Sequence, residues 1–122
     1  LYEFPIYALG DPEKIEQVLI NLIVNAIKYG EFGGTVMVSI EASGSDKILL
    51  KVIDNGEGIK KENIGRIFER FYRVDKSRSR DQGGSGLGLA IVKHIIEAHK
   101  ETISLESEYG KGSTFYFTLK RA

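Results

Sequence analysis

The stretch Ile48-Leu49-Leu50-Lys51-Val52-Ile53-Asp54-Asn55-Gly56-Glu57-Gly58-Ile59 decides how this chain folds and where its site lies. The apolar run from Ile48 to Ile53 predicts a strand, and the strand ends at Asp54, directly before a glycine-rich turn. A carboxylate at the carboxyl end of a strand stands where ligand sites of α/β sheets lie. Asp-Asn-Gly is also an ordinary turn sequence, so this stretch alone does not distinguish a turn from a ligand site.

A second glycine-rich stretch, Gly83-Gly84-Ser85-Gly86-Leu87-Gly88-Leu89, opens a predicted helix. Bare backbone N–H groups at the start of a helix bind phosphate well. The stretch lacks the Gly-Lys-Ser/Thr ending of a Walker A loop and does not follow a strand, so both common nucleotide-binding folds are disfavoured. Gly84, Gly86 and Gly88 span a loop-to-helix junction, which suits N–H donors directed at phosphate.

An amphipathic helix is predicted before the first glycine box. Asp11 and Pro12 are typical of a helix start, and Gly30 with the Gly33-Gly34 pair ends the pattern. Apolar residues recur at helical spacing, which predicts a buried face made of Ile15, Val18, Leu19, Leu22, Ile23, Ala26 and Ile27.

Asn21, Asn25 and Lys28 fall on another stripe of that helix. The carbonyl oxygen of Asn25 is a hard, neutral ligand that suits Mg²⁺ beside phosphate oxygens and water, and Lys28 is placed to meet a phosphate. For any single asparagine, a solvated polar face is the more common explanation. Because the stripe directly precedes two glycine boxes, we favour a nucleotide pocket.

The remaining patterns predict one α+β domain over residues 1–122. An antiparallel hairpin is expected from Val36 to Ile53, then a helix over Lys61–Phe71 that packs Ile64, Ile67, Phe68 and Phe71. A polar surface loop follows from Arg73 to Gly84, then a buried helix over Leu87–Ala98. Strands near Ile103–Ser107 and Thr114–Leu119 are joined across Tyr109-Gly110-Lys111-Gly112. The economical arrangement is a two-layer α/β sandwich, with a mixed, mostly antiparallel sheet covered on one face by helices.

Composition excludes several classes of protein. Seventeen Lys and Arg balance 17 Asp and Glu, so no global field attracts nucleic acid or an anionic membrane. The absence of cysteine excludes disulfides and thiolate chemistry. No apolar run approaches the roughly 18–20 residues that span a bilayer. The chain starts at Leu1 rather than Met, which predicts a domain of a longer protein.

Four motifs, in order, resemble those of the sensor histidine kinases. Residues 17–29 resemble the N box, Asp54–Ile59 the G1 box, Ile67–Arg73 the F box and Gly83–Lys93 the G2 box. The resemblance runs from about Asp11 to Leu119. It implies the Bergerat ATP-binding fold, which is shared with gyrase, the heat-shock chaperone ATPases and the mismatch-repair ATPases.

The resemblance also implies roles for individual residues in binding ATP and Mg²⁺. Asn25 would hold the metal, with Asn21 and Lys28 on its phosphate side, and Tyr29 would lie against adenine. Asp54 would accept a hydrogen bond from the adenine amine, while Gly56, Gly58 and Ile59 shape the base site. Gly84, Ser85, Gly86, Leu87 and Gly88 would cradle phosphates under a lid. Arg73 would reach the γ-phosphate. One or more of Lys76, Arg78 and Arg80 would assist it, and the sequence does not distinguish among these three.

One position distinguishes the branches of this superfamily. The ATPase branches carry a glutamate general base four residues before the metal-binding asparagine, where this chain has Asn21. An amide has no useful basicity, whereas a neutral histidine is already nucleophilic, so transfer to histidine is favoured over hydrolysis. His94 and His99 are interpreted as packing or surface residues, and the acceptor histidine is expected on a separate dimerisation domain. The family commonly has Gly-Gly after His99, where this chain has Lys100-Glu101, which puts the geometry of that turn in doubt.

The sequence therefore predicts the catalytic domain of a histidine kinase in a two-component system. Its expected partners are the histidine-bearing dimerisation domain of the same parent protein and a downstream response regulator, without nucleic acid or direct membrane contact. The domain is expected to be cytoplasmic even if the parent is membrane-anchored. A hydrolytic ATPase of the same fold and a non-catalytic adenine-nucleotide module are the alternatives.

Overall fold

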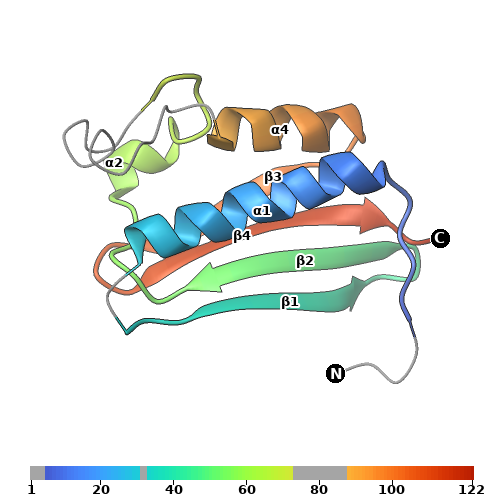
Figure 1. The fold of residues 1–122 in the computed structure, drawn as a ribbon, viewed down its shortest axis with the longest axis horizontal. Helices are drawn as coiled ribbons and strands as arrows, with labels where there is room; N and C mark the ends of the chain where they lie inside the picture. Colours follow the sequence, from blue (N-terminus) through green and yellow to red (C-terminus); the bar gives the residue numbers. More distant parts are fainter. Residues whose placement is uncertain (1–4, 31–32, 73–87) are drawn as a thin grey trace.

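The computed structural model describes residues 5–30, 33–72 and 88–122. Its strands form one open sheet in the order β1-β2-β4-β3, and helices α1 and α4 cover one face of it (Figure 1). The elements are α1 (Pro12–Tyr29), β1 (Val36–Ser43), β2 (Lys47–Asp54), α2 (Lys61–Ile64), α4 (Gly88–Ala98), β3 (Ile103–Glu108) and β4 (Gly112–Lys120). The predicted α+β sandwich is confirmed. Within the described residues all three strand pairings are antiparallel, so the sheet there is not mixed as expected.

Helix α1 begins where the sequence predicts. The Asp11 side chain accepts hydrogen bonds from the backbone N–H groups of Glu13 and Lys14, and so satisfies two of the unpaired donors of the first turn. Val18 and Leu22 are fully buried, as predicted, but Ile27 is 65% exposed. At about 100° per residue, Ile27 lies half a turn around the helix from Val18, so it cannot share the buried face.

The core lies between the helices and one face of the sheet. Alternate residues of β2 and β4 point into it, which is the two-residue period expected of strands with one covered face. The Phe68 ring meets Phe115 edge-on, with centroids 6.0 Å apart, and so anchors the segment after α2 to the centre of β4. The buried apolar residues of the two layers are Val18, Leu22, Ala26, Val92, Ile95 and Ile96 from the helices and Ile48, Leu50, Val52, Ile103, Phe115, Phe117 and Leu119 from the strands.

The helix predicted over Lys61–Phe71 is shorter than expected. Only Lys61–Ile64 is α-helical, and hydrogen bonds three residues apart then carry the chain through turns to Tyr72. Ile67 is buried and Phe68 packs against the core, as predicted. Phe71 does not pack there: its φ of 63° puts it in the left-handed region, and its side chain is 64% exposed.

Helix α4 ends in a left-handed cap although glycine is missing there. Lys100 has φ 61°, its N–H bonds the Glu97 carbonyl at 2.9 Å, and the Glu101 N–H bonds the Ile96 carbonyl at 3.1 Å. This pair of bonds is the Schellman arrangement that glycine usually permits. The turn geometry is therefore normal, and Lys100 carries the steric cost of about 1–2 kcal/mol for a left-handed non-glycine residue.

Candidate functional site

One end of the molecule gathers the predicted motifs. The C-terminal end of α1, the tip of β2, α2 and the turn between β3 and β4 all lie at that end (Figure 1). The β1–β2 hairpin places them there, because it turns at Gly44-Ser45-Asp46 and returns β2 toward the last turns of α1. Segments far apart in the sequence thus meet at the carboxyl end of β2.

Asp54 is half-buried at that end of β2. Its Oδ1 accepts a hydrogen bond from the Gly56 N–H at 2.9 Å, and Ser113 of β4 lies directly opposite it in the sheet register. Burial raises the pKa of the Asp54 carboxyl, although the backbone N–H groups of Gly56 and Ser113 favour its charged form. A partly desolvated carboxylate with oriented neighbours is suited to accept a hydrogen bond from a ligand.

The turn after Asp54 interlocks with the β3–β4 turn. Gly110 N–H donates to the Glu57 carbonyl at 2.6 Å, and the Tyr109 hydroxyl donates to the Glu57 carboxylate at 3.3 Å. Gly58 has φ 77°, and a Cβ there would overlap the Glu108 carbonyl oxygen and lie 3.0 Å from its carbon. Glycine at position 58 is thus required by both conformation and close approach.

Two serines connect these turns at the base of the site. Ser107 Oγ accepts a hydrogen bond from Ile59 N–H at 2.7 Å and lies 2.8 Å from Ser113 Oγ. Ser113 is only 7% exposed, the one polar residue buried within the described part of the chain. Sequence reasoning missed both, since serines beside a glycine turn look like ordinary turn residues, although Ser113 stands among alternating core residues of β4.

The polar stripe of α1 lies between the solvent and the core. Asn21, Asn25 and Lys28 are all half-buried, and the Asn21 side-chain amide reaches the Gly88 carbonyl at 3.5 Å. Gly88 is the first residue of α4, so the helix predicted after the second glycine box starts beside the stripe. At this contact the N box therefore lies next to the start of α4, within the G2 box.

Several predicted site residues lie outside the described residues: Arg73, Lys76, Arg78, Arg80, Gly84, Ser85, Gly86 and Leu87. Tyr29 is the last residue of α1, but its side chain is not among those that the structure describes. Their roles stay predictions.

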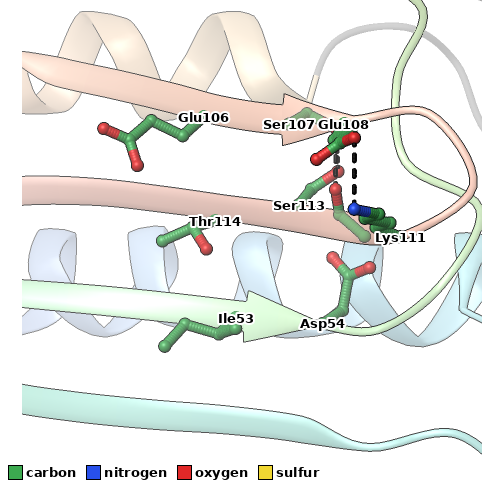
Figure 2. A pocket seen from close by; sticks show the side chains of 9 residues that line it. Ile53, Asp54, Glu106, Ser107, Glu108, Lys111, Ser113 and Thr114 are labelled. Atoms are coloured by element: carbon green, nitrogen blue, oxygen red, sulfur yellow. Dashed lines mark hydrogen bonds and ion pairs between the residues drawn. The ribbon is translucent and has the colours of Figure 1, made fainter.

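A cavity of about 410 Å³ opens at the end of β2 (Figure 2). Asp54, Ser107 and Ser113 border it at the ends of β2, β3 and β4, and Lys111 borders it from the β3–β4 turn. It is also lined by Ile53, Glu106, Glu108, Gly112 and Thr114. The strand register puts the side chains of Ile53, Glu106 and Thr114 on the face of the sheet without helices, so this cavity lies across the sheet from α1 and is separate from the predicted pocket.

The two histidines are placed as the sequence interpretation expects. His94 is exposed on α4. His99 Nε2 accepts the Asp11 N–H at 3.0 Å, while its Nδ1 lies 2.8 Å from the Ile95 carbonyl. A neutral ring with its proton on Nδ1 satisfies both contacts, so His99 ties the start of α1 to the end of α4.

Within residues 5–30, 33–72 and 88–122, no helix is long and apolar enough to span a bilayer. The same ranges contain no group of three or more His, Cys, Asp and Glu side chains that could bind a metal ion by themselves.

These features place a half-buried carboxylate and a glycine turn at one end of a two-layer sandwich. The family described as "Histidine kinase-, DNA gyrase B-, and HSP90-like ATPase" matches residues 10–122, and the chain belongs to that family. It is 48% identical over 115 residues to the sensor histidine kinase WalK of Bacillus subtilis (strain 168), covering 93% of this chain and 19% of that protein. It is 47% identical over 111 residues to the sensor-like histidine kinase SenX3 of Mycolicibacterium smegmatis, covering 91% and 29%.

Solved structures support the same assignment. The mycobacterial sensor histidine kinase MprB superposes with a TM-score of 0.82 at 28% identity, covering 96% of this chain and 76% of that one. Full-length ShkA in complex with AMPPNP gives 0.81 at 30% identity, covering 97% and 24%. The chain is thus a histidine kinase ATPase domain, and it spans between about a fifth and a third of the length of those curated relatives.

Proposed function

We propose that this domain binds Mg-ATP and transfers the γ-phosphoryl group to a histidine on a separate dimerisation domain of its parent protein. The observation that carries the proposal is the half-buried Asp54 carboxylate, which lies at the end of the molecule where the C-terminal end of α1 and the G1 turn come together. The similarity to sensor histidine kinases, one of them solved with AMPPNP, supports it.

The base end of ATP would be held by Asp54. Its carboxylate accepts a hydrogen bond from the exocyclic amine of adenine, and the interlocked glycine turn lets the ring approach the backbone of Gly56, Gly58 and Ile59. Tyr29, at the end of α1, would lie against the ring.

The phosphate end would lie between α1 and the start of α4. Asn25 offers a neutral oxygen to Mg²⁺, and Lys28 offers a cation to a phosphate. The distance between Asn21 and Gly88 supports this arrangement, since it brings the α1 stripe to the last glycine of the second glycine box. Gly84, Ser85, Gly86, Leu87 and Gly88 would donate backbone N–H groups to the phosphates, and Arg73 would contact the γ-phosphate.

The transfer itself needs a nucleophile from outside this chain. A neutral imidazole nitrogen of the partner histidine attacks the γ-phosphorus, the new N–P bond forms as the bond to the bridging oxygen breaks, and ADP leaves. The proton of the attacking ring passes to a base outside this domain. Mg²⁺ and the cations of the phosphate end would offset the charge on the phosphoryl oxygens.

Labelled ATP tests the proposal directly. This domain is mixed with its histidine-bearing domain, and acid-labile phosphate on the partner is the expected product. Free phosphate alone would instead indicate a hydrolytic ATPase, which Asn21 disfavours, and binding without either product would indicate a non-catalytic module. Asp54→Asn should remove both binding and transfer, while Asp46→Asn, in the exposed β1–β2 turn, should change neither.

The biological setting follows from the same proposal. The parent protein would pass the phosphoryl group to a response regulator, with residues 1–122 forming a single catalytic domain on the cytoplasmic side. An Arg73→Ala variant that slows transfer more than it weakens ADP binding would support the γ-phosphate role, whereas equal losses would count against it.

A further inference from the structure

His99 bonds helix α1 to helix α4 at the end of α1 away from the proposed phosphate site. Its Nε2 accepts a hydrogen bond from the Asp11 N–H at 3.0 Å, and its Nδ1 lies 2.8 Å from the Ile95 carbonyl. A carbonyl oxygen only accepts, so Nδ1 carries the ring proton and Nε2 is left as the acceptor for α1. The proposed function gives this half-buried ring no role.

The ring lies directly against the start of α1. Asp11 is the N-cap residue of that helix: its side chain accepts hydrogen bonds from the first turn, while its own N–H is bonded to His99. A Cβ at Gly10 would lie 3.3 Å from His99 Nε2, closer than an ordinary van der Waals contact. Glycine at position 10 therefore leaves the room that the ring occupies, and the first turn of α1 is held at a defined place on the end of α4.

A second close approach joins the same two helices at the other end of α4. The Asn21 side-chain amide lies 3.5 Å from the Gly88 carbonyl. The two helices run side by side in opposite directions over the sheet (Figure 1), so the two approaches are ten residues apart on α1 (11 to 21) and eleven apart on α4 (88 to 99). At 1.5 Å per residue these lengths are about 15 and 17 Å, so both approaches are made in a single register of α4 along α1.

Between these two ends both helices bury apolar side chains in the common core: Val18 and Leu22 from α1, and Val92 and Ile96 from α4. Apolar burial is non-directional, whereas a hydrogen bond weakens steeply when its donor and acceptor move out of line. The bond at His99 is therefore more sensitive to a shift along the helix axis than the apolar contacts are. Because a helix is a rigid element, a shift at His99 also moves Gly88 along α1.

We propose that His99 is a positioning residue for phosphate binding, which holds α4 in the register that places Gly88 beside the Asn21 and Asn25 stripe of α1. The inference rests on the proposed function, because it takes Mg²⁺ and the phosphates to lie between α1 and the start of α4. The base end depends on Asp54 and the G1 turn, which β2 and the β3–β4 turn hold in place. Loss of the bond at His99 should therefore weaken the binding of phosphates more than the binding of the base.

Two amide substitutions separate the bond to α1 from the bond within α4. In His99→Gln the amide group reaches the place of Nε2, and its oxygen can accept the Asp11 N–H. His99→Asn is one methylene shorter and reaches only the place of Nδ1, so it loses the bond to α1.

The readout is the ratio of two dissociation constants on the 122-residue chain, that of Mg-ATP from calorimetry and that of adenosine, which has no phosphate, from an NMR titration. His99→Asn should lower the preference for Mg-ATP over adenosine about fivefold, the effect of one hydrogen bond. His99→Gln should keep the preference.

His94→Asn is the matched control, because His94 lies on the exposed side of the same helix. It should leave both dissociation constants unchanged. All variants are compared under conditions where urea unfolding shows that each is fully folded, so that a loss of stability does not enter the ratio.

Equal weakening of Mg-ATP and adenosine in His99→Asn, or no weakening of either, would overturn the proposal and leave His99 a structural residue. An equal fall of the ratio in His99→Gln would also overturn it, since that variant keeps the acceptor. If His99→Asn does not fold, His99→Phe decides, because it keeps a ring and removes both nitrogens; an unchanged ratio there would count against the proposal.

Failure of the proposed function looks different. The unmodified chain would then bind no Mg-ATP, and this inference would fall with it. If the unmodified chain binds Mg-ATP and Asp54→Asn abolishes binding, while the His99 variants keep the ratio, the proposed function stands and this inference fails.

Discussion

Replacing Gly58 by alanine tests how the adenine end of the site is built. Gly58 has φ 77°, and its added Cβ would overlap the Glu108 carbonyl oxygen and lie 3.1 Å from Tyr109 Cα. Because the nearest atoms are backbone, the overlap is relieved only if the G1 turn and the β3–β4 turn move apart. That movement breaks two hydrogen bonds, from Gly110 N–H to Glu57 and from Ile59 N–H to Ser107.

The expected magnitude follows from these parts. The left-handed backbone costs about 1 kcal/mol for a residue with a Cβ, and the two lost hydrogen bonds cost about 1 kcal/mol each. Gly58→Ala should therefore lower the free energy of unfolding by about 3 kcal/mol, the sum of these contributions. Gly110→Ala is the matched control: its φ is 91° and its Cβ would meet nothing within 4 Å. Gly110→Ala should lower the free energy of unfolding only by the contribution of the left-handed backbone, about 1 kcal/mol.

Urea unfolding of the two variants and of the unmodified chain measures these losses, and calorimetric titration with ATP measures the site. Gly58→Ala should also weaken ATP binding under conditions where it is fully folded, because the turn that carries Gly56 is displaced. Equal losses of stability in the two variants would refute the reasoning, since they would show that close approach to Glu108 adds nothing.

Three further predictions concern the end of α4 and the choice of reaction. Lys100→Gly removes a left-handed side chain and should raise the free energy of unfolding by about 0.5–1 kcal/mol, whereas Lys93→Gly, on the exposed side of α4, should lower it by about 1 kcal/mol; a loss in both would contradict the Schellman cap. Burial alone would raise the pKa of the Glu101 carboxyl, but hydrogen bonds from Lys47 and Thr118, with the charges of Lys47 and Lys120, hold it below its usual range. The group therefore contributes stability above its unfolded pKa and loses it as the pH falls through the lower folded pKa, so Glu101→Gln should flatten the acid limb of a stability-versus-pH curve; an unchanged limb would exclude this cause. Asn21→Glu supplies a carboxylate near the phosphate end and should increase ATP hydrolysis, measured as released phosphate; an unchanged rate with intact ATP affinity would argue against the role assigned to position 21.

Much of the fold was predictable because its signals are local. The N-cap of Asp11, the apolar spacing of α1 and the alternation of β4 all depend on residues within a few positions of one another. The exceptions are residues whose environment is not local. Ile27 fits a helical pattern but lies beyond the width of the buried stripe. Phe71 is apolar, yet the left-handed turn directs it to solvent.

The site was predictable to a similar extent. Asp54 and the α1 stripe were predicted from residue type and position. The structure places the Asn21 amide 3.5 Å from the Gly88 carbonyl and Asp54 at the half-buried end of β2, and their roles in binding ATP stay predictions. Ser107 and Ser113 were not found, because a serine acquires a role only through its hydrogen-bond partners. Those partners, Ile59 and Gly112, are set by the pairing of β3 with β4 and by the packing of two turns.

The sequence by itself determined that β2 ends in Asp54 and a glycine turn, and that an amide stripe runs along α1. Both follow from periodicity and turn chemistry within short stretches. Only the tertiary structure decided that the β3–β4 turn closes on the G1 turn and that Ser113 of β4 lies opposite Asp54. That closure joins residues about fifty positions apart, and it depends on strand register and on a glycine with positive φ, neither of which a local pattern specifies.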